Sequence, residues 1–172
     1  MINIIQMLIL FFYFIITSVI AQDENPYHYN KVYGYENDTI VTKPFHKDSL
    51  CTFATKLVGT PYKSPGRSSA GFDCSGFAFY CFREHSIYLP YSSHEQAEIG
   101  KSISTSDGEA GDLIFFQGYD LNDKSVHHVG ILVNKKGEKL RFIHASSSHG
   151  VRSETLDSPY YKARFIGIRR VH

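Results

Sequence analysis

Cysteine is scarce in this sequence, and its scarcity excludes a fold held together by disulfides. The 172 residues contain only Cys51, Cys74 and Cys81, and an odd number leaves at least one thiol unpaired. Cys74 and Cys81 fall in one predicted helix, two turns apart, which separates their Cα atoms by about 10 Å. A disulfide tolerates at most about 7 Å between Cα atoms, so this pair cannot bridge.

Net charge is also nearly absent. The formal charge at pH 7 is +1, so the sequence offers no electrostatic attraction to nucleic acid or to an anionic membrane surface. It contains no internal repeat and no low-complexity tract. The hydrophobic content of 42% instead indicates a globular chain that can form a core.

The N-terminal segment lacks charged side chains. Residues 7–21 are apolar and precede the polar Gln22, which is typical of a secretory signal peptide. No Lys or Arg comes before this run, so an uncleaved N-terminal anchor is the alternative. No cysteine stands directly after this run, where a lipid anchor would be attached, which argues against such an anchor. We expect a signal peptide over 1–21, a polar linker or arm over 22–44 and one domain over 45–172. The mature protein is then exported to the periplasm or cell envelope, without a membrane span.

Helical spacing dominates the first half of this domain. Apolar residues recur at intervals of three and four across 50–58, which predicts a helix that ends near Gly59. A loop rich in Pro, Gly and Ser separates it from a second predicted helix over about 74–85. Ser93 and Gln96 have the spacing of a capping box, which predicts a short third helix.

The second half changes to patterns typical of strands. Strands are predicted over residues 112–116, 127–134, 139–146 and 164–171. Gly137 marks a hairpin turn between the second and third of them. Asp112 is expected to hold a turn, and Phe115 and Phe116 to fill the core. Helices followed by an antiparallel sheet predict an α+β fold.

The motif GFDCSG, residues 71–76, places a cysteine where a nucleophile is favoured. If Asp73 caps the helix that follows, the Cys74 thiol stands beside free N–H groups and the positive end of the helix dipole. This position favours the thiolate, and a neighbouring N–H can hold an oxyanion. A single cysteine is more often a small core residue, so the prediction requires a partner base.

Two histidines supply a candidate base and its orienting group. Alternation puts His128 on the strand face opposite Val129 and Ile131. If those two residues enter the core of the sheet, His128 points towards the helix over 74–85. His144 on the return strand lies beside it when the registers match, and can hold its tautomer.

These motifs together resemble one known family. GTPY, GFDCSG, LPYSSHEQ, GDLIFF, HVGI and FIHASSSHGVR occur in the order and spacing of the NlpC/P60 cysteine peptidases. The resemblance covers about Leu50 to the C-terminus. It implies a papain-like α+β fold, with N-terminal helices packed on a mostly antiparallel sheet or partial barrel. It also implies hydrolysis of cell-wall peptides, typically at the γ-D-glutamyl–diaminopimelate bond, without a metal or cofactor.

The family pattern implies roles for individual residues. Its catalytic set is Cys74 as nucleophile, His128 as base and His144 as the third polar residue. Its substrate-binding set is Tyr62, Asp73 and Ser75. One departure concerns the loop after PY, where the family usually carries an aromatic residue and two glycines. This chain keeps Gly66 but has Ser64 and Pro65 at the other two positions, so the peptide specificity does not carry over directly.

The resulting hypothesis is attack of a Cys74 thiolate, paired with protonated His128, on the scissile amide carbonyl. The backbone N–H of Cys74 and the Tyr62 hydroxyl would hold the oxyanion. Three alternatives stay open: an amidase or acyltransferase acting on another bond, a non-catalytic wall-binding module, and a zinc site. The zinc site would use Cys74, His128 and His144, with or without His149, although no C-x-x-C or HExxH spacing supports it. We expect a monomer whose partners are peptidoglycan peptides.

Overall fold

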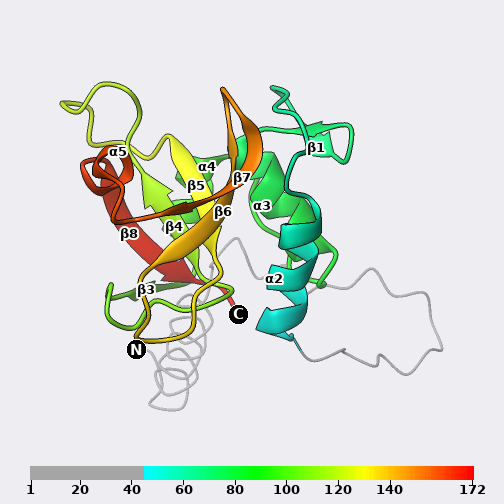
Figure 1. Cartoon of the computed structure of the whole chain (residues 1–172), viewed down its shortest axis with the longest axis horizontal. Coiled ribbons are helices and arrows are strands. Elements are labelled where there is room, and N and C mark those ends of the chain that lie inside the picture. Colours follow the sequence, from blue (N-terminus) through cyan, green and yellow to red (C-terminus); the bar gives the residue numbers. More distant parts are fainter. Residues whose placement is uncertain (1–44) are drawn as a thin grey trace, which may run out of the picture. The chain divides into compact units, whose positions relative to one another are not determined.

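The computed structural model describes residues 45–172, which correspond to the predicted domain. The predicted signal peptide and linker lie outside the described residues. Helices come first in these residues and an antiparallel sheet follows (Figure 1), which confirms the α+β prediction. Across 45–172, none of the helices combines the length and the apolar character that crossing a membrane requires.

Three helices precede most of the sheet. They are α2 (Lys47–Lys56), α3 (Cys74–Arg83) and α4 (Ser93–Glu98). The first two confirm the helices predicted from apolar spacing. A two-stranded hairpin that the sequence did not predict lies between them, formed by β1 (Arg67–Ser68) and β2 (Gly71–Phe72).

The capping box of α4 begins one residue earlier than predicted. Ser92 Oγ accepts a hydrogen bond from the Glu95 N–H, and the Glu95 carboxylate accepts one from the Ser92 N–H, both at 3.2 Å. Gln96 has a different task. Its side chain is fully buried and donates to the carbonyls of Ser75 at 3.1 Å and Pro90 at 2.8 Å. The prediction of Ser93 and Gln96 as the box was therefore wrong, because Gln96 ties α4 to α3.

The main sheet has six antiparallel strands. They are β3 (Lys101–Ile103), β4 (Leu113–Phe116), β5 (His128–Leu132), β6 (Arg141–Ser146), β7 (Gly150–Thr155) and β8 (Phe165–Arg170), in the order β3-β8-β4-β5-β6-β7. The short helix α5 (Pro159–Lys162) precedes β8. Four of these strands confirm the predicted ones, whereas β3, β7 and α5 were not predicted.

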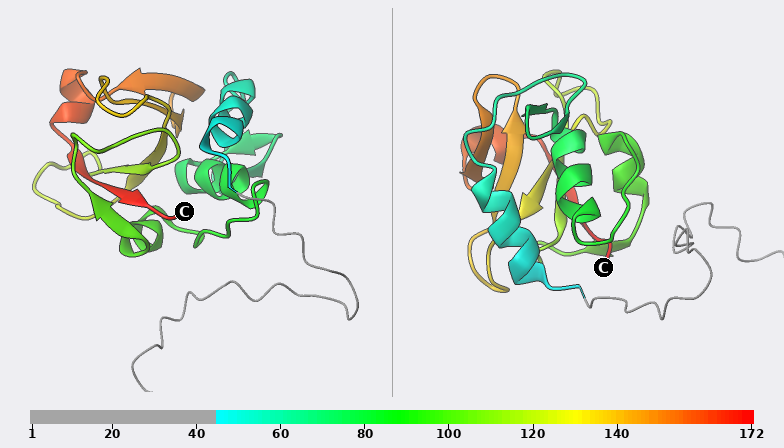
Figure 2. Two further views of the ribbon diagram at one scale, coloured as in Figure 1. Left: turned by 90° about the horizontal axis from the view of Figure 1, so that it is seen from below. Right: turned by 90° about the vertical axis from the view of Figure 1, so that its right-hand side faces the viewer.

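Two hydrophobic clusters cover opposite faces of this sheet. Val129 and Ile131 pack in the cluster that contains α3 residues such as Phe77. Leu132 and Phe142 belong to the second cluster, towards α5. Figures 1 and 2 show α2 and α3 together on one side of the strands and α5 beside β8, away from them. Helices α2 and α3 therefore lie on the sheet face to which Val129 and Ile131 of β5 point.

Asp112 confirms its predicted role at a turn. Its carboxylate is completely buried and accepts a hydrogen bond from the Glu109 N–H at 3.0 Å. It also pairs with Arg170 of β8, at 2.7 Å from Nε and 2.8 Å from Nη2. Phe115 and Phe116 are buried as predicted. The turn before β4 is thus joined to the last strand of the chain.

Candidate active site

The helix start at Cys74 is built by local hydrogen bonds. Asp73 is the N-cap of α3, and its Oδ1 accepts from the Gly76 N–H at 2.7 Å and from Ser75 Oγ at 3.1 Å. Cys74 is therefore the first residue of the helix, as predicted. Its thiol is half-buried and donates to the carbonyl oxygen of His127 at 3.8 Å, which places the sulfur beside the start of β5.

The loop before the helix packs closely against this start. Gly66 N–H donates to Asp73 Oδ2 at 2.9 Å. A Cβ on Gly76 would stand 1.9 Å from the Gly66 carbonyl oxygen, and a Cβ on Gly66 would stand 2.3 Å from the carbonyl of Lys63. Both positions accordingly require glycine because backbones approach each other there. This contact explains why Gly66 is kept in a loop that otherwise departs from the family pattern.

His128 and His144 form a hydrogen-bonded pair. His128 Nε2 and His144 Nδ1 are 2.7 Å apart, with the two rings nearly perpendicular at 88°. The register that pairs Ile131 with Ile143 sets Gly130 opposite His144. A Cβ on Gly130 would stand 3.3 Å from the His144 Cβ. The absence of a side chain at Gly130 therefore leaves room for the diagonal contact between the two imidazoles.

The predicted reason for the direction of His128 was wrong. Val129 and Ile131 face the helices, so the alternation puts His128 on the opposite face, where its ring lies 6.1 Å from that of Phe116. His128 nevertheless shares a cavity with Cys74. It is the first residue of β5, so its side chain projects at the end of the strand, where the start of α3 is also found.

A cavity of about 640 Å³ is lined by four of the six predicted site residues. Tyr62, Cys74, His128 and His144 all line it. Asp73 and Ser75 do not line it, since their side chains bond to each other and to the helix start. Of the residues between 60 and 71, only Tyr62 is among the lining residues. The expected substrate-binding set is thus divided by the structure.

The sequence did not indicate the residue that contacts the second nitrogen of His144. Tyr161 of α5 places its hydroxyl 3.0 Å from His144 Nε2, on the side of the ring opposite His128. Its ring packs on Phe142 and Phe116, at centroid distances of 5.0 and 5.3 Å. Pro159 at the first helical position could have indicated α5. No local signal connects Tyr161 with His144.

Burial keeps the candidate catalytic groups uncharged. It raises the pKa of the Cys74 thiol to about 11, with a further contribution from Asp73, and the N–H groups of Ser75 and Val129 lower it only in part. Burial lowers the pKa of His128 to about 4, and burial and His128 together lower that of His144. The predicted resting thiolate is thus not favoured, because burial outweighs the N–H groups at the helix start.

The histidine pair makes folding stability depend on pH. An unfolded histidine titrates at about pH 6.5, whereas His128 in the folded protein titrates at about 4. Its stabilising contribution is therefore complete above pH 6.5 and is lost as the pH falls towards 4. We expect the free energy of unfolding to decrease by about 2–3 kcal/mol between pH 7 and pH 4.5 from this residue. Urea titrations at several pH values measure this change.

His128→Gln should flatten this pH dependence, since glutamine does not titrate in this range. His94→Gln is the matched control, because His94 lies exposed on α4 and its replacement should leave the slope unchanged. Equal slopes for the wild type and His128→Gln would contradict a neutral buried imidazole at this position.

The described residues give no support to a zinc site. Within 45–172, no three His, Cys, Asp or Glu side chains are grouped so that they could hold a metal ion. The His128–His144 hydrogen bond also occupies one nitrogen of each ring, and Tyr161 occupies the other nitrogen of His144. Of the four ring nitrogens, only His128 Nδ1 is left without a hydrogen bond to another residue of the described domain, and this nitrogen together with Cys74 falls short of the three protein ligands that a zinc site requires.

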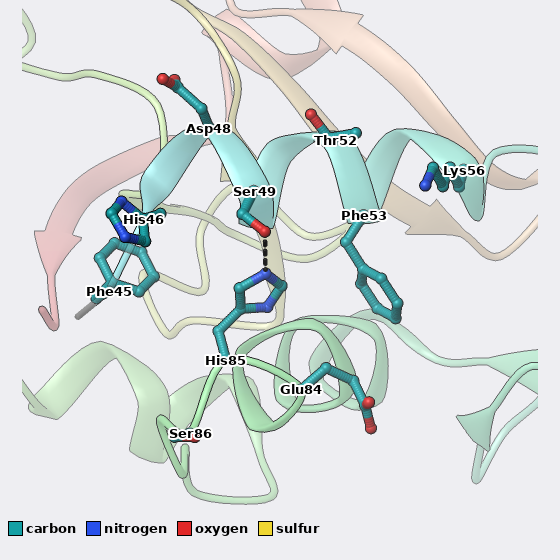
Figure 3. A pocket seen from close by; sticks show the side chains of 10 residues that line it. All are labelled: Phe45, His46, Asp48, Ser49, Thr52, Phe53, Lys56, Glu84, His85 and Ser86. Carbon is teal, nitrogen blue, oxygen red and sulfur yellow. Dashed lines mark hydrogen bonds between the residues drawn. The ribbon is translucent and has the colours of Figure 1, made fainter. Parts of the chain in front are cut away.

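A second cavity, of about 530 Å³, lies between α2 and the C-terminal end of α3 (Figure 3). Ser49 and His85 point towards each other across it, with Oγ and Nε2 3.2 Å apart. His85 Nδ1 is bonded to the Cys81 carbonyl at 2.9 Å, so Nε2 accepts from the serine. No cysteine lines this cavity. Its polar contacts connect the two helices.

Comparison with known proteins points to cell-wall enzymes. The chain is 40% identical over 114 residues to the murein DD-endopeptidase MepS/murein LD-carboxypeptidase of Escherichia coli, covering 66% of this chain and 56% of that protein. It is 34% identical over 115 residues to the γ-D-glutamyl-L-lysine dipeptidyl-peptidase of Bacillus subtilis, covering 66% and 37%. The chain therefore spans little more than half the length of the first of these relatives.

A solved structure agrees in fold. The crystal structure of an NlpC/P60 family protein from Bacillus cereus superposes with a TM-score of 0.66 at 33% identity, covering 73% of this chain and 40% of that one. The sequence profile of the NlpC/P60 family matches residues 59–170, which is well over half of the chain. The match includes the start of α3 and both histidine-bearing strands. This protein belongs to the NlpC/P60 family.

Proposed function

We propose that this protein is a cysteine peptidase that hydrolyses peptidoglycan stem peptides, with Cys74 as nucleophile, His128 as base and His144 as orienting group. One observation carries the proposal: a half-buried thiol at a helix start shares one cavity with a hydrogen-bonded histidine pair. The family membership and the names of the two relatives support the same chemistry. The hydrolysed bond is proposed to be γ-D-glutamyl–diaminopimelate.

The first step is acylation of Cys74. His128 Nε2 is engaged with His144, so Nδ1 is the nitrogen that can accept the thiol proton. The sulfur then forms a bond to the scissile carbonyl carbon, and the carbonyl electron pair moves onto oxygen. The backbone N–H of Cys74 and the Tyr62 hydroxyl are the proposed donors to that oxyanion. Burial raises the pKa of Tyr62, which keeps its hydroxyl protonated as a donor.

The second step returns the enzyme to its starting state. The tetrahedral intermediate collapses, the carbon–nitrogen bond breaks, and His128 gives its proton to the leaving amine. Water then attacks the thioester while His128 removes its proton, and the sulfur leaves and recovers a proton. Because thiol and imidazole both begin uncharged, the proton transfer belongs to the attack itself rather than to a pre-formed ion pair.

A digest of defined muropeptides tests the proposed bond. Purified protein is incubated with a disaccharide tripeptide, a tetrapeptide and a DD-crosslinked dimer, and the products are read by mass spectrometry. We expect the stem to be cut after the γ-D-glutamyl residue, which releases peptides that begin with diaminopimelate. Cleavage at the DD-crosslink alone would contradict this bond but keep the peptidase. No cleavage of any of the three would overturn the proposed function.

Same-family chemistry on another bond is the main alternative. An amidase or acyltransferase would use Cys74 and His128 in the same way, and it would differ in the products of that digest. Contact of Asp73 and Ser75 with the substrate stays a prediction, as do export to the cell envelope and the monomeric state. The position of Asp73 at the helix cap supports an indirect role, because it determines where Cys74 stands.

A further inference from the structure

Three side chains continue the site behind Cys74 in a single hydrogen-bonded row. His128 Nε2 meets His144 Nδ1 at 2.7 Å, and His144 Nε2 meets the Tyr161 hydroxyl at 3.0 Å. His144 is only 1% exposed, so neither of its nitrogens can take a partner from bulk solvent. Both nitrogens depend on their protein neighbours, and the proton positions along the row are therefore coupled.

The row can carry its protons in two directions. In one direction, His128 donates from Nε2 to His144, and His144 donates from Nε2 to Tyr161. Nδ1 of His128 is then a free lone pair that can accept the Cys74 proton. In the other direction, Tyr161 donates to His144, His144 donates to His128, and His128 carries its hydrogen on Nδ1. A base with that tautomer cannot accept the thiol proton.

We propose that the Tyr161 hydroxyl is the acceptor that ends the row, and that it thereby holds His128 in the tautomer with a free Nδ1. Tyr161 is thus a positioning residue acting through His144. Its role in turnover rests on the proposed function of Cys74 and His128. The proton arrangement itself does not depend on any substrate.

Two observations favour this direction. Tyr161 is half-buried and lines the cavity, so its own O–H can turn to cavity solvent while an oxygen lone pair accepts from His144. In the opposite direction, His128 would carry an N–H at Nδ1, and this atom has no hydrogen-bond acceptor within residues 45–172. That donor would depend on cavity solvent for a partner, whereas an unprotonated Nδ1 in the cavity shared with Cys74 is free to accept a proton.

Packing against two phenylalanine rings restricts the Tyr161 ring and keeps its hydroxyl beside His144. The ring packs edge-on against Phe142 at 5.0 Å and lies 5.3 Å from the Phe116 centroid. The preceding residue offers a comparison. Tyr160 also lines the cavity, and its ring lies 5.1 Å from that of Tyr161. It is 47% exposed and its hydroxyl makes no hydrogen bond to residues of the described domain, so Tyr160→Phe removes the same oxygen, keeps the ring and leaves the hydrogen bonds of the histidine row in place.

Imidazole nitrogen chemical shifts test the proposal directly. Long-range proton–nitrogen NMR spectra distinguish the two tautomers of a neutral histidine, and His128→Gln and His144→Gln spectra assign the signals. We expect both rings to be protonated at Nε2 in the wild type and in Tyr160→Phe. In Tyr161→Phe we expect the protons to move to Nδ1. A wild-type His128 protonated at Nδ1, or an unchanged spectrum in Tyr161→Phe, would overturn the proposal.

Kinetic measurements report the consequence. Tyr161→Phe should lower kcat by about 10- to 100-fold with little change in KM, because losing an orienting partner or its tautomer weakens the base rather than substrate binding. The rate of Cys74 alkylation by iodoacetamide should fall in parallel, whereas Tyr160→Phe should keep both rates. Equal rates in the two variants would contradict the assignment. If Tyr161→Phe does not fold, the wild-type NMR spectrum still tests the proposed tautomer of His128. If no peptide is cleaved, the proposed function fails, but the NMR spectra and the alkylation rates still test the tautomer. A failure of the proposed function is therefore distinguishable from a failure of the assignment of Tyr161.

Discussion

Cys74→Ala is expected to lower the hydrolysis of stem peptides by roughly 10⁴- to 10⁶-fold, the range found when a covalent nucleophile is removed. The reason is that Cys74 supplies the only thiol among the described residues that line the cavity, so its replacement leaves His128 without the proposed nucleophile. The thiol is half-buried, so its loss should change the free energy of unfolding by no more than about 1 kcal/mol. Product release from a defined muropeptide and urea unfolding measure the two effects.

Cys51→Ala is the matched control for this experiment. Cys51 is also half-buried, but its thiol donates to the Leu132 carbonyl at 3.5 Å and lies outside the cavity. Its replacement should leave the rate of hydrolysis unchanged. The account of Cys74 as nucleophile would be abandoned if Cys74→Ala retained the wild-type rate, or if both variants lost activity to the same extent.

Arg170→Ala is expected to destabilise the fold by about 3–5 kcal/mol, because it leaves a buried carboxylate without its charged partner. The Asp112 side chain is completely buried, and two guanidinium nitrogens of Arg170 bind it at 2.7 and 2.8 Å. The same guanidinium also pairs with Glu109 at 3.2 Å. Removing it therefore breaks the ion pairs that join β8 to the turn before β4. The urea midpoint should fall while the slope of the transition is kept.

Arg169→Ala provides the comparison for Arg170. Arg169 is the preceding residue of β8 and forms no ion pair with a residue of the described domain, so its loss should cost about 0.5 kcal/mol or less. Adding Asp112→Asn to Arg170→Ala should recover part of the lost stability, since a neutral amide has no charge to desolvate. Equal destabilisation by the two arginine variants would show that the buried pair is not what holds β8.

The local parts of the site could be predicted from the sequence. Asp73 caps α3 through a bond to Gly76, three residues away, so the motif GFDCSG already contains the geometry that puts Cys74 at a helix start. His128 and His144 could be placed on neighbouring strands because alternation and a turn between two strands need few residues. The turn at Asp112 is likewise made by the N–H of Glu109, three residues earlier.

The sequence predictions were wrong where a side chain's position depends on contacts with residues distant in the sequence. The sheet face chosen for His128 was wrong because alternation gives relative directions, and only the docking of α3 decides which face meets the helices. Ser93 and Gln96 have the spacing of a capping box, yet the buried Gln96 side chain donates a hydrogen bond to the carbonyl of Ser75, 21 residues earlier. A pattern of residue types does not contain such distant partners.

The sequence by itself determined the family and the α+β class and was enough to propose the thiol and the imidazoles of the candidate site, since each rests on contacts within a few residues or on motif order. The tertiary structure alone decided how those groups are tuned. Burial sets the pKa of Cys74 to about 11 and lowers that of His128 to about 4. Tyr161 reaches His144 from 17 residues along the chain. Desolvation and such long-range hydrogen bonds exist only once the strands and helices have closed around the site.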